Sequence, residues 1–126
     1  MPSRILHREL KVRTCGHGDA IDITPLIEGE LKGIKNGLVN IYTPEERIAL
    51  ITIEYEPRIL DDLRRYIKEY LKICENLVPA ILGRSLDIPL VNGRLRLGTW
   101  QQVVLLELGT SSREVSVYVT IICEDP

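Results

Sequence analysis

The sequence lacks several features that would assign it to a functional class at once. It contains no phenylalanine and only two histidines, so a metal centre built mainly from imidazole ligands is nearly excluded by number. Its longest apolar runs, such as residues 103–106, stop after about four residues, whereas a membrane-spanning helix needs roughly 20. No secretory signal pattern follows the N-terminus. We therefore expect a cytoplasmic protein without a membrane partner.

Common catalytic motifs are also missing. The sequence has neither of the glycine-rich patterns that cradle phosphates, no G-x-S-x-G nucleophile pattern and no H-E-x-x-H zinc pattern. The two histidines are His7, on the expected outer side of a strand, and His17, in a glycine-rich loop, so solvent-facing roles are expected for both. Cys15 and His17 together form at most half of a metal site. We therefore predict no metal centre from these residues.

Charge and cysteine content restrict the partners and the compartment. There are 16 basic and 18 acidic residues, so no positive excess is available to neutralise phosphates, and we expect no nucleic-acid partner. The three cysteines stand far apart with no C-x-x-C pair, which indicates reduced thiols. Isoleucine, leucine and valine supply most of the apolar residues, a composition that resembles that of thermophile proteins.

Length and patterning predict a single domain over residues 1–126. Alternating apolar residues predict a strand at 4–13, with Leu6, Leu10 and Val12 on one side and Arg8 breaking the pattern. Helical spacing predicts helices at 25–35, with Thr24 as the N-cap, and at 58–74. Further strands are predicted at 38–43, 48–55, 86–91, 94–97, 101–108 and 113–123. This order predicts an α+β domain with two helices packed on an antiparallel sheet or sandwich.

The Asn92-Gly93 pair lies between two predicted strands. Both residues tolerate positive φ, as a type I′ turn requires, so the pair predicts a tight hairpin. Downstream, Gly98, Thr99, Trp100 and Gln101 combine the only tryptophan with hydroxyl and amide groups that can orient a polar ligand. Composition alone favours the alternative interpretation, a turn whose Trp100 side chain fills the interior.

A second polar segment contains several carboxylates. Glu45, Glu46 and Arg47 follow a predicted strand, and Glu54 ends the next one. Clustered carboxylates can share a proton or bind a divalent cation. Exposed loop charges would produce the same pattern and are the commoner explanation of it.

A family resemblance is carried by several motifs that occur in a fixed order. They are Asp22-Ile23-Thr24, Gly33 to Val39, Thr43-Pro44, Ile81 to Leu86 and, most specifically, Pro89 to Gln101. Over residues 22–119 the chain resembles the YjbQ-like family, also called the secondary thiamine-phosphate synthase family. The resemblance implies a compact α+β subunit, a homotrimer, a histidine-containing polar site and thiamine-phosphate synthase activity.

The chain departs from the family pattern at the histidines. Glu45 or Glu46 stands where the family has its first histidine, Asn76 stands where it has another, and the segment that bears a further one is largely missing. Asparagine does not titrate near neutral pH and glutamate is ordinarily a fixed anion, so neither replaces the proton exchange of imidazole. The first hypothesis is therefore a divergent trimeric binding or structural module with a degenerate catalytic site.

The two hypotheses assign different roles to the same residues. As a module, the protein would line a polar cleft for an unidentified small molecule. As an enzyme, it would condense a pyrimidine pyrophosphate with a thiazole phosphate, with Mg²⁺ held by the carboxylates and phosphate held by the arginines. No other cofactor is predicted, and the aliphatic C-terminal strands are the expected trimer contact. The predicted catalytic residues are Glu45, Glu46, Arg47 and Glu54, and the predicted ligand-binding residues are Asn76, Arg84, Thr99, Trp100 and Gln101.

Overall fold

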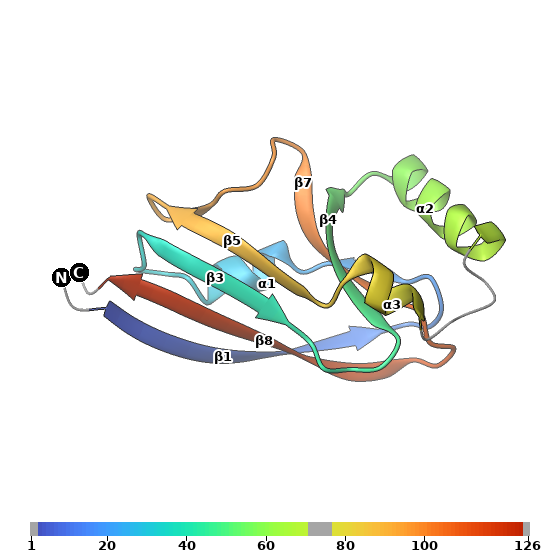
Figure 1. Ribbon diagram of the computed structural model, residues 1–126, viewed down its shortest axis with the longest axis horizontal. Helices are drawn as coiled ribbons and strands as arrows, with labels where there is room; N and C mark the ends of the chain where they lie inside the picture. Colours follow the sequence, from blue (N-terminus) through green and yellow to red (C-terminus); the bar gives the residue numbers. More distant parts are fainter. Residues whose placement is uncertain (1–2, 71–76, 125–126) are drawn as a thin grey trace.

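Two antiparallel sheets make up most of the computed structural model, which describes residues 3–70 and 77–124 (Figure 1). The five-stranded sheet has the order β1 (Ser3–Thr14), β8 (Arg113–Glu124), β3 (Gly37–Tyr42), β5 (Ser85–Val91) and β6 (Arg94–Leu95). The three-stranded sheet has the order β2 (Ala20–Asp22), β7 (Gln101–Glu107) and β4 (Ile48–Glu54). The helices are α1 (Thr24–Gly29), α2 (Pro57–Tyr70) and α3 (Leu77–Leu82). The predicted α+β antiparallel sandwich is confirmed.

The main core lies between the two sheets. Strand β8 contributes every second residue to it, because side chains alternate across a strand and one face of this sheet is covered. The inward residues are Val115, Val117, Val119 and Ile121, which are 0–1% exposed, as the alternation predicts. Leu10 and Val12 of β1 join them, so the predicted inner side of the first strand is also confirmed.

Strand β7 is buried on both faces. Val103 and Leu105 face the main core, while Val104 and Leu106 face a second apolar cluster. That cluster includes Leu60 and other residues of α2 and α3, the two helices that cover the outer face of the three-stranded sheet (Figure 1). A strand buried on both faces needs an unbroken apolar run, which explains the run found at 103–106.

The first predicted helix is wrong in length. Instead of 25–35, α1 spans Thr24–Gly29, and Ile23 rather than Thr24 occupies the N-cap position. The Thr24 hydroxyl accepts a hydrogen bond from the Val103 N–H at 2.8 Å, which joins α1 to β7. Beyond Gly29 the chain continues in turns that still bury Leu31, so the apolar spacing reflects burial without a continuing helix.

The second helix and the short third helix also differ from the predictions. Helix α2 begins at Pro57 and is described to Tyr70, and the rest of the predicted 58–74 helix lies outside the described residues. Helix α3 was not predicted, because six residues are too few to establish a helical period and Pro79 argues against a helix. The structure therefore describes three helices where the sequence predicts two.

Local backbone demands explain two glycines. Asn92 and Gly93 have φ values of 52° and 79°, which confirms the hairpin turn between β5 and β6. At Gly37 any Cβ would overlap the carbonyl oxygen of Ile122 on the neighbouring strand.

The described part of the chain has no helix with the length and apolar character that a bilayer span requires.

Candidate functional site

A buried ion pair joins the end of β7 to the start of β8. Both Nε and Nη2 of Arg113 lie 3.0 Å from the carboxylate oxygens of Glu107, which gives a bidentate pair. The Glu107 side chain is fully buried, whereas the Arg113 side chain is 30% exposed. Such a pair fixes both position and orientation, because the planar guanidinium matches the two oxygens of a carboxylate.

The Glu107 carboxylate accepts two further hydrogen bonds. The Thr14 hydroxyl donates to Oε2 at 2.7 Å and the Gly109 N–H donates to Oε1 at 2.8 Å. Burial by itself raises the pKa of Glu107, but the hydrogen bonds from Arg113, Thr14 and Gly109 outweigh it and hold that pKa below its ordinary value. The same contact raises the pKa of Arg113. Both groups are therefore charged at neutral pH.

The charged loop, which is the segment Glu45 to Arg47 singled out in the sequence, packs against this ion pair. Arg113 Nη2 also donates to the carbonyl of Glu46, and the Thr43 hydroxyl donates to the carbonyl of Ser116 at 2.8 Å. Arg47 adopts a positive φ of 60°, and its Nε is buried without a hydrogen-bond partner among the described residues. The loop is thus anchored through its backbone to the β7–β8 end of the sandwich.

The predicted carboxylates do not meet within one chain. In the register of β4 and β7, Ile48 pairs with Glu107 and Glu54 pairs with Gln101, so Glu54 lies at the end of β4 opposite the charged loop. The rise of a strand puts these two ends about 20 Å apart. Glu45 and Glu46 therefore cannot share one cation with Glu54 in the same subunit. Across residues 3–70 and 77–124, no group of three or more His, Cys, Asp or Glu side chains is suited to a metal ion.

The turn from Gly98 to Gln101, called the tryptophan corner below, lies at the Glu54 end of β4. Trp100 is 72% exposed, so the interpretation of its side chain as an interior plug is wrong. The turn is nevertheless fixed, because the Gln101 N–H donates to the carbonyl of Gly98 and the Gly98 N–H donates to the Gln101 side chain. Thr99 lies in the same exposed turn. An exposed indole on a fixed turn is a typical anchor for a binding partner.

The remaining predicted residues divide between the two ends. Arg84 lies beside the charged loop, where its carbonyl accepts a hydrogen bond from the Thr43 N–H. Asn76 lies outside the described residues. His7 is exposed and contacts the Thr120 hydroxyl at 3.2 Å, and His17 is exposed in its loop. The structure thus groups Glu45, Glu46, Arg47 and Arg84 at one end, and Glu54, Thr99, Trp100 and Gln101 at the other.

Sequence reasoning missed Glu107, Arg113 and Thr14. A signal for the first was present, because Glu107 directly follows the apolar run 103–106 and precedes Leu108. A charge at the end of a doubly buried strand needs a partner, since an unpaired buried carboxylate is costly. The identity of that partner depends on the turn at Gly109 and on the pairing of β1 with β8, which the run itself does not specify.

Comparison with known proteins gives a consistent assignment. Residues 8–124 match the family described as UPF0047 protein YjbQ-like. A UPF0047 protein of Methanothermobacter thermautotrophicus is 30% identical over 128 aligned residues, which cover 89% of this chain and 90% of the relative. One of Archaeoglobus fulgidus is 31% identical over 123 residues, which cover 86% of this chain and 97% of the relative.

Solved structures agree with the fold. A structure from Sulfolobus solfataricus, described as that of a YbjQ-like protein of unknown function, has a TM-score of 0.90 and 26% identity, and the match covers 98% of this chain and all of that one. A hypothetical protein of Aeropyrum pernix has a TM-score of 0.82 and 30% identity, with coverage of 94% and 99%. These names carry the family designation or no designation, and state no activity.

Proposed function

The chain belongs to the UPF0047, YjbQ-like family, and on that basis we propose that it is a cytoplasmic, homotrimeric binding module whose family-type catalytic site has degenerated. The observation that carries this proposal is the register of β4 against β7, which holds Glu54 and the charged loop at opposite ends of one strand. General acid–base or metal chemistry needs such groups within a few ångströms of one reacting atom. The exposed free thiol of Cys15 fits a reducing compartment.

The proposed ligand contact is the tryptophan corner. Thr99, Trp100 and Gln101 supply a hydroxyl, an indole N–H and an amide on a turn that is already fixed, so little conformational entropy is lost when they bind. Glu54 pairs with Gln101 and adds one carboxylate beside them. This set suits recognition of a small polar molecule.

The proposed trimer contact is the outer face of the five-stranded sheet. Ile5, Ile122, Leu38 and Pro89 are aligned across four neighbouring strands by the register. The first three of these side chains are 63%, 47% and 39% exposed, so they form an apolar row on the surface. Burial of an apolar row between copies stabilises association by roughly 25 cal/mol per Å². Two of the four strands, β5 and β8, belong to the C-terminal half that the sequence points to.

Light scattering tests the proposed assembly. We expect the wild-type chain to have three times the mass of one 14.3 kDa subunit at micromolar concentration. Ile122→Asp should give monomers, because it places an unpaired charge in the proposed contact. Ile81→Asp is the matched control, since Ile81 is 56% exposed on α3, away from that face. A monomeric wild-type chain would contradict the proposal.

An activity assay separates the module from the family-type enzyme. The purified chain is incubated with the pyrimidine pyrophosphate, the thiazole phosphate and Mg²⁺, and thiamine phosphate is measured by chromatography. We expect no product beyond the protein-free background. Product formation that Glu46→Ala abolishes would overturn the module proposal, because it would assign the charged loop to catalysis.

A further inference from the structure

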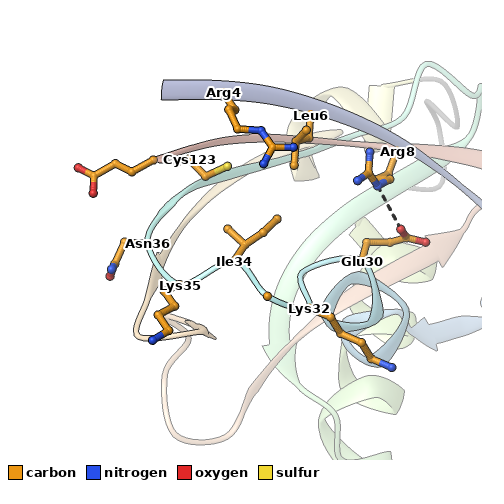
Figure 2. Close-up of a pocket in the computed structure, with 11 residues that line it drawn as sticks. Arg4, Leu6, Arg8, Glu30, Lys32, Ile34, Lys35, Asn36 and Cys123 are labelled. Atoms are coloured by element: carbon orange, nitrogen blue, oxygen red, sulfur yellow. Dashed lines mark ion pairs between the residues drawn. The ribbon is translucent and has the colours of Figure 1, made fainter. Parts of the chain in front are cut away.

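A cleft of about 540 Å³ opens at the end of the sandwich where both chain termini lie. Its walls are the N-terminal part of β1, the last residues of β8, and the segment 30–36 between α1 and β3. Figure 2 shows Arg4, Leu6 and Arg8 extending from β1 toward that segment. The volume falls in the range of about 300–1,000 Å³ that is typical of small-molecule sites.

Two arginines of the cleft stand where the strand pattern calls for apolar residues. Arg4, Leu6 and Arg8 share the side of β1 that continues as Leu10 and Val12 in the core, because alternate residues of a strand face the same way. A guanidinium on the core-facing side is costly unless the space beside it is open or charged. The cleft supplies that space, and it explains why Arg8 breaks the apolar alternation of the first strand.

The guanidinium of Arg8 has two contacts that orient it toward the cleft. Its Nε lies 3.4 Å from the carboxylate of Glu30, and its Nη1 donates to the carbonyl of His7 at 3.1 Å. Figure 2 marks the ion pair with Glu30 across the cleft. A guanidinium fixed in this way loses less side-chain entropy on binding than a free one.

The charge of the cleft is opposite in sign to that of the whole chain. Its lining contains Arg4, Arg8, Lys32 and Lys35 against the acidic Glu30 and Glu124, whereas the chain as a whole has a net charge of −2. Figure 2 shows Lys32 and Lys35 extending away from β1, so these lysines add to the positive field around the cleft, whereas Arg4 and Arg8 extend toward its opposite wall. Arginine in particular matches the paired oxygens of carboxylates and phosphates.

Part of the cleft is apolar. Leu6 and Ile34 are half-buried, pack against the main core and line the cleft, and the buried Cys123 contributes a thiol. A bare inorganic anion would leave this surface in water, whereas an attached aliphatic group would cover it. The ligand chemistry therefore combines an oxyanion with an apolar group.

We propose that this cleft binds a small organic oxyanion, a carboxylate or a phosphate ester, with its charge against Arg4 and Arg8 and its apolar part against Leu6 and Ile34. None of these residues belongs to the tryptophan corner or the charged loop. The inference is therefore independent of whether the chain is a module or an enzyme.

Calorimetric titration of the full chain with four probes tests each part of the proposal. Hexyl phosphate and hexanoate carry both a negative charge and an alkyl group. Inorganic phosphate carries only the charge, and hexanol carries only the alkyl group. We expect saturable binding, one molecule per chain, for at least one of the first two, and weaker binding of both single-feature probes. The tighter of the two identifies phosphate ester or carboxylate as the natural class. Hexanol that binds as tightly as the anions, or no saturable binding of either anion at millimolar concentration, would overturn the proposal.

Variants locate the binding. Arg8→Gln and Arg4→Gln should each weaken binding of the tighter probe about tenfold, or about 1.4 kcal/mol, because each removes one charged contact to the oxyanion. Arg58→Gln removes the same charge from the exposed start of α2 and should leave affinity unchanged. In NMR spectra, the changes in backbone amide chemical shift on binding should be confined to residues 30–36, the N-terminal end of β1 and the C-terminal end of β8. Equal weakening by Arg58→Gln, or shifts elsewhere, would contradict this location.

Discussion

At the scale of single residues, the contacts of Glu107 explain how a carboxylate stays ionised in the interior. It is fully buried, yet Arg113, Thr14 and Gly109 satisfy both of its oxygens. A buried pair contributes modestly to stability when it is intact, but removal of one partner leaves an uncompensated charge. The pair also joins β1, the charged loop and the β7–β8 turn, because each provides one of its contacts.

Arg113→Met should therefore be strongly destabilising. We expect the free energy of unfolding to fall by about 3–5 kcal/mol, because the Glu107 charge remains buried without its partner. Urea denaturation at fixed protein concentration measures the change. Arg65→Met is the matched control: the Arg65 side chain is 65% exposed where it pairs with Asp62, and its loss should cost about 0–1 kcal/mol. Equal effects of the two variants would contradict the role given to the buried pair.

The depressed pKa of Glu107 predicts acid sensitivity. The unfolded state takes up a proton at the ordinary carboxyl pKa, whereas the folded state resists protonation until lower pH, so stability rises with pH between the two values. The stabilisation from Glu107 should be complete above the ordinary carboxyl range and should disappear as the pH falls through the folded pKa. Glu107→Gln should flatten this part of the stability profile, measured by urea denaturation at a series of pH values. An unchanged dependence of the unfolding free energy on pH in that variant would contradict the prediction.

At the scale of elements, local sequence and tertiary packing contribute differently to the β5–β6 hairpin and to α1. The hairpin turn needs positive φ at Asn92 and Gly93, and the dipeptide itself supplies this. Helix α1 has only six residues and no side-chain cap, so it depends on the burial of Ile27 and on the bond between Thr24 and β7.

The same substitution should have opposite effects in these two elements. Gly93→Ala places a Cβ on a residue with φ of 79° and should destabilise the fold by about 1–2 kcal/mol. Gly29→Ala should be stabilising by about 0.4–1 kcal/mol, because a Cβ there meets nothing within 4 Å and alanine favours the helix. Thermal denaturation of both variants compares the signs. A loss of stability in Gly29→Ala would contradict the account of α1.

At the scale of the whole molecule, the three-stranded sheet is covered on both faces, whereas the five-stranded sheet is covered well on only one. The inner faces meet in the main core and α2 and α3 cover the three-stranded sheet, but the outer face of the five-stranded sheet exposes Ile5, Leu38 and Ile122. This row is the contact that we propose for the trimer. Stability of the chain should then depend on association as well as on the fold.

Protein concentration should therefore shift the melting temperature. If copies associate through this face only when folded, a tenfold increase in concentration raises the melting temperature by mass action. Ile122→Asp should abolish the concentration dependence, whereas Ile81→Asp should preserve it. Differential scanning calorimetry at two concentrations makes the comparison. A wild-type melting temperature that is independent of concentration would contradict association through the sheet face.

The sequence by itself determined the parts of this protein that depend on neighbouring residues. Alternation in β1 and β8, the turn at Asn92-Gly93 and the helical period of α2 all follow from local geometry. Tertiary structure decided the rest: that Glu54 lies far from Glu45, that Trp100 is exposed, and that Glu107 meets Arg113. The physical reason is that burial and proximity depend on which strands pair and in what register, and a short window of sequence contains no information about a partner strand 47 to 59 residues away.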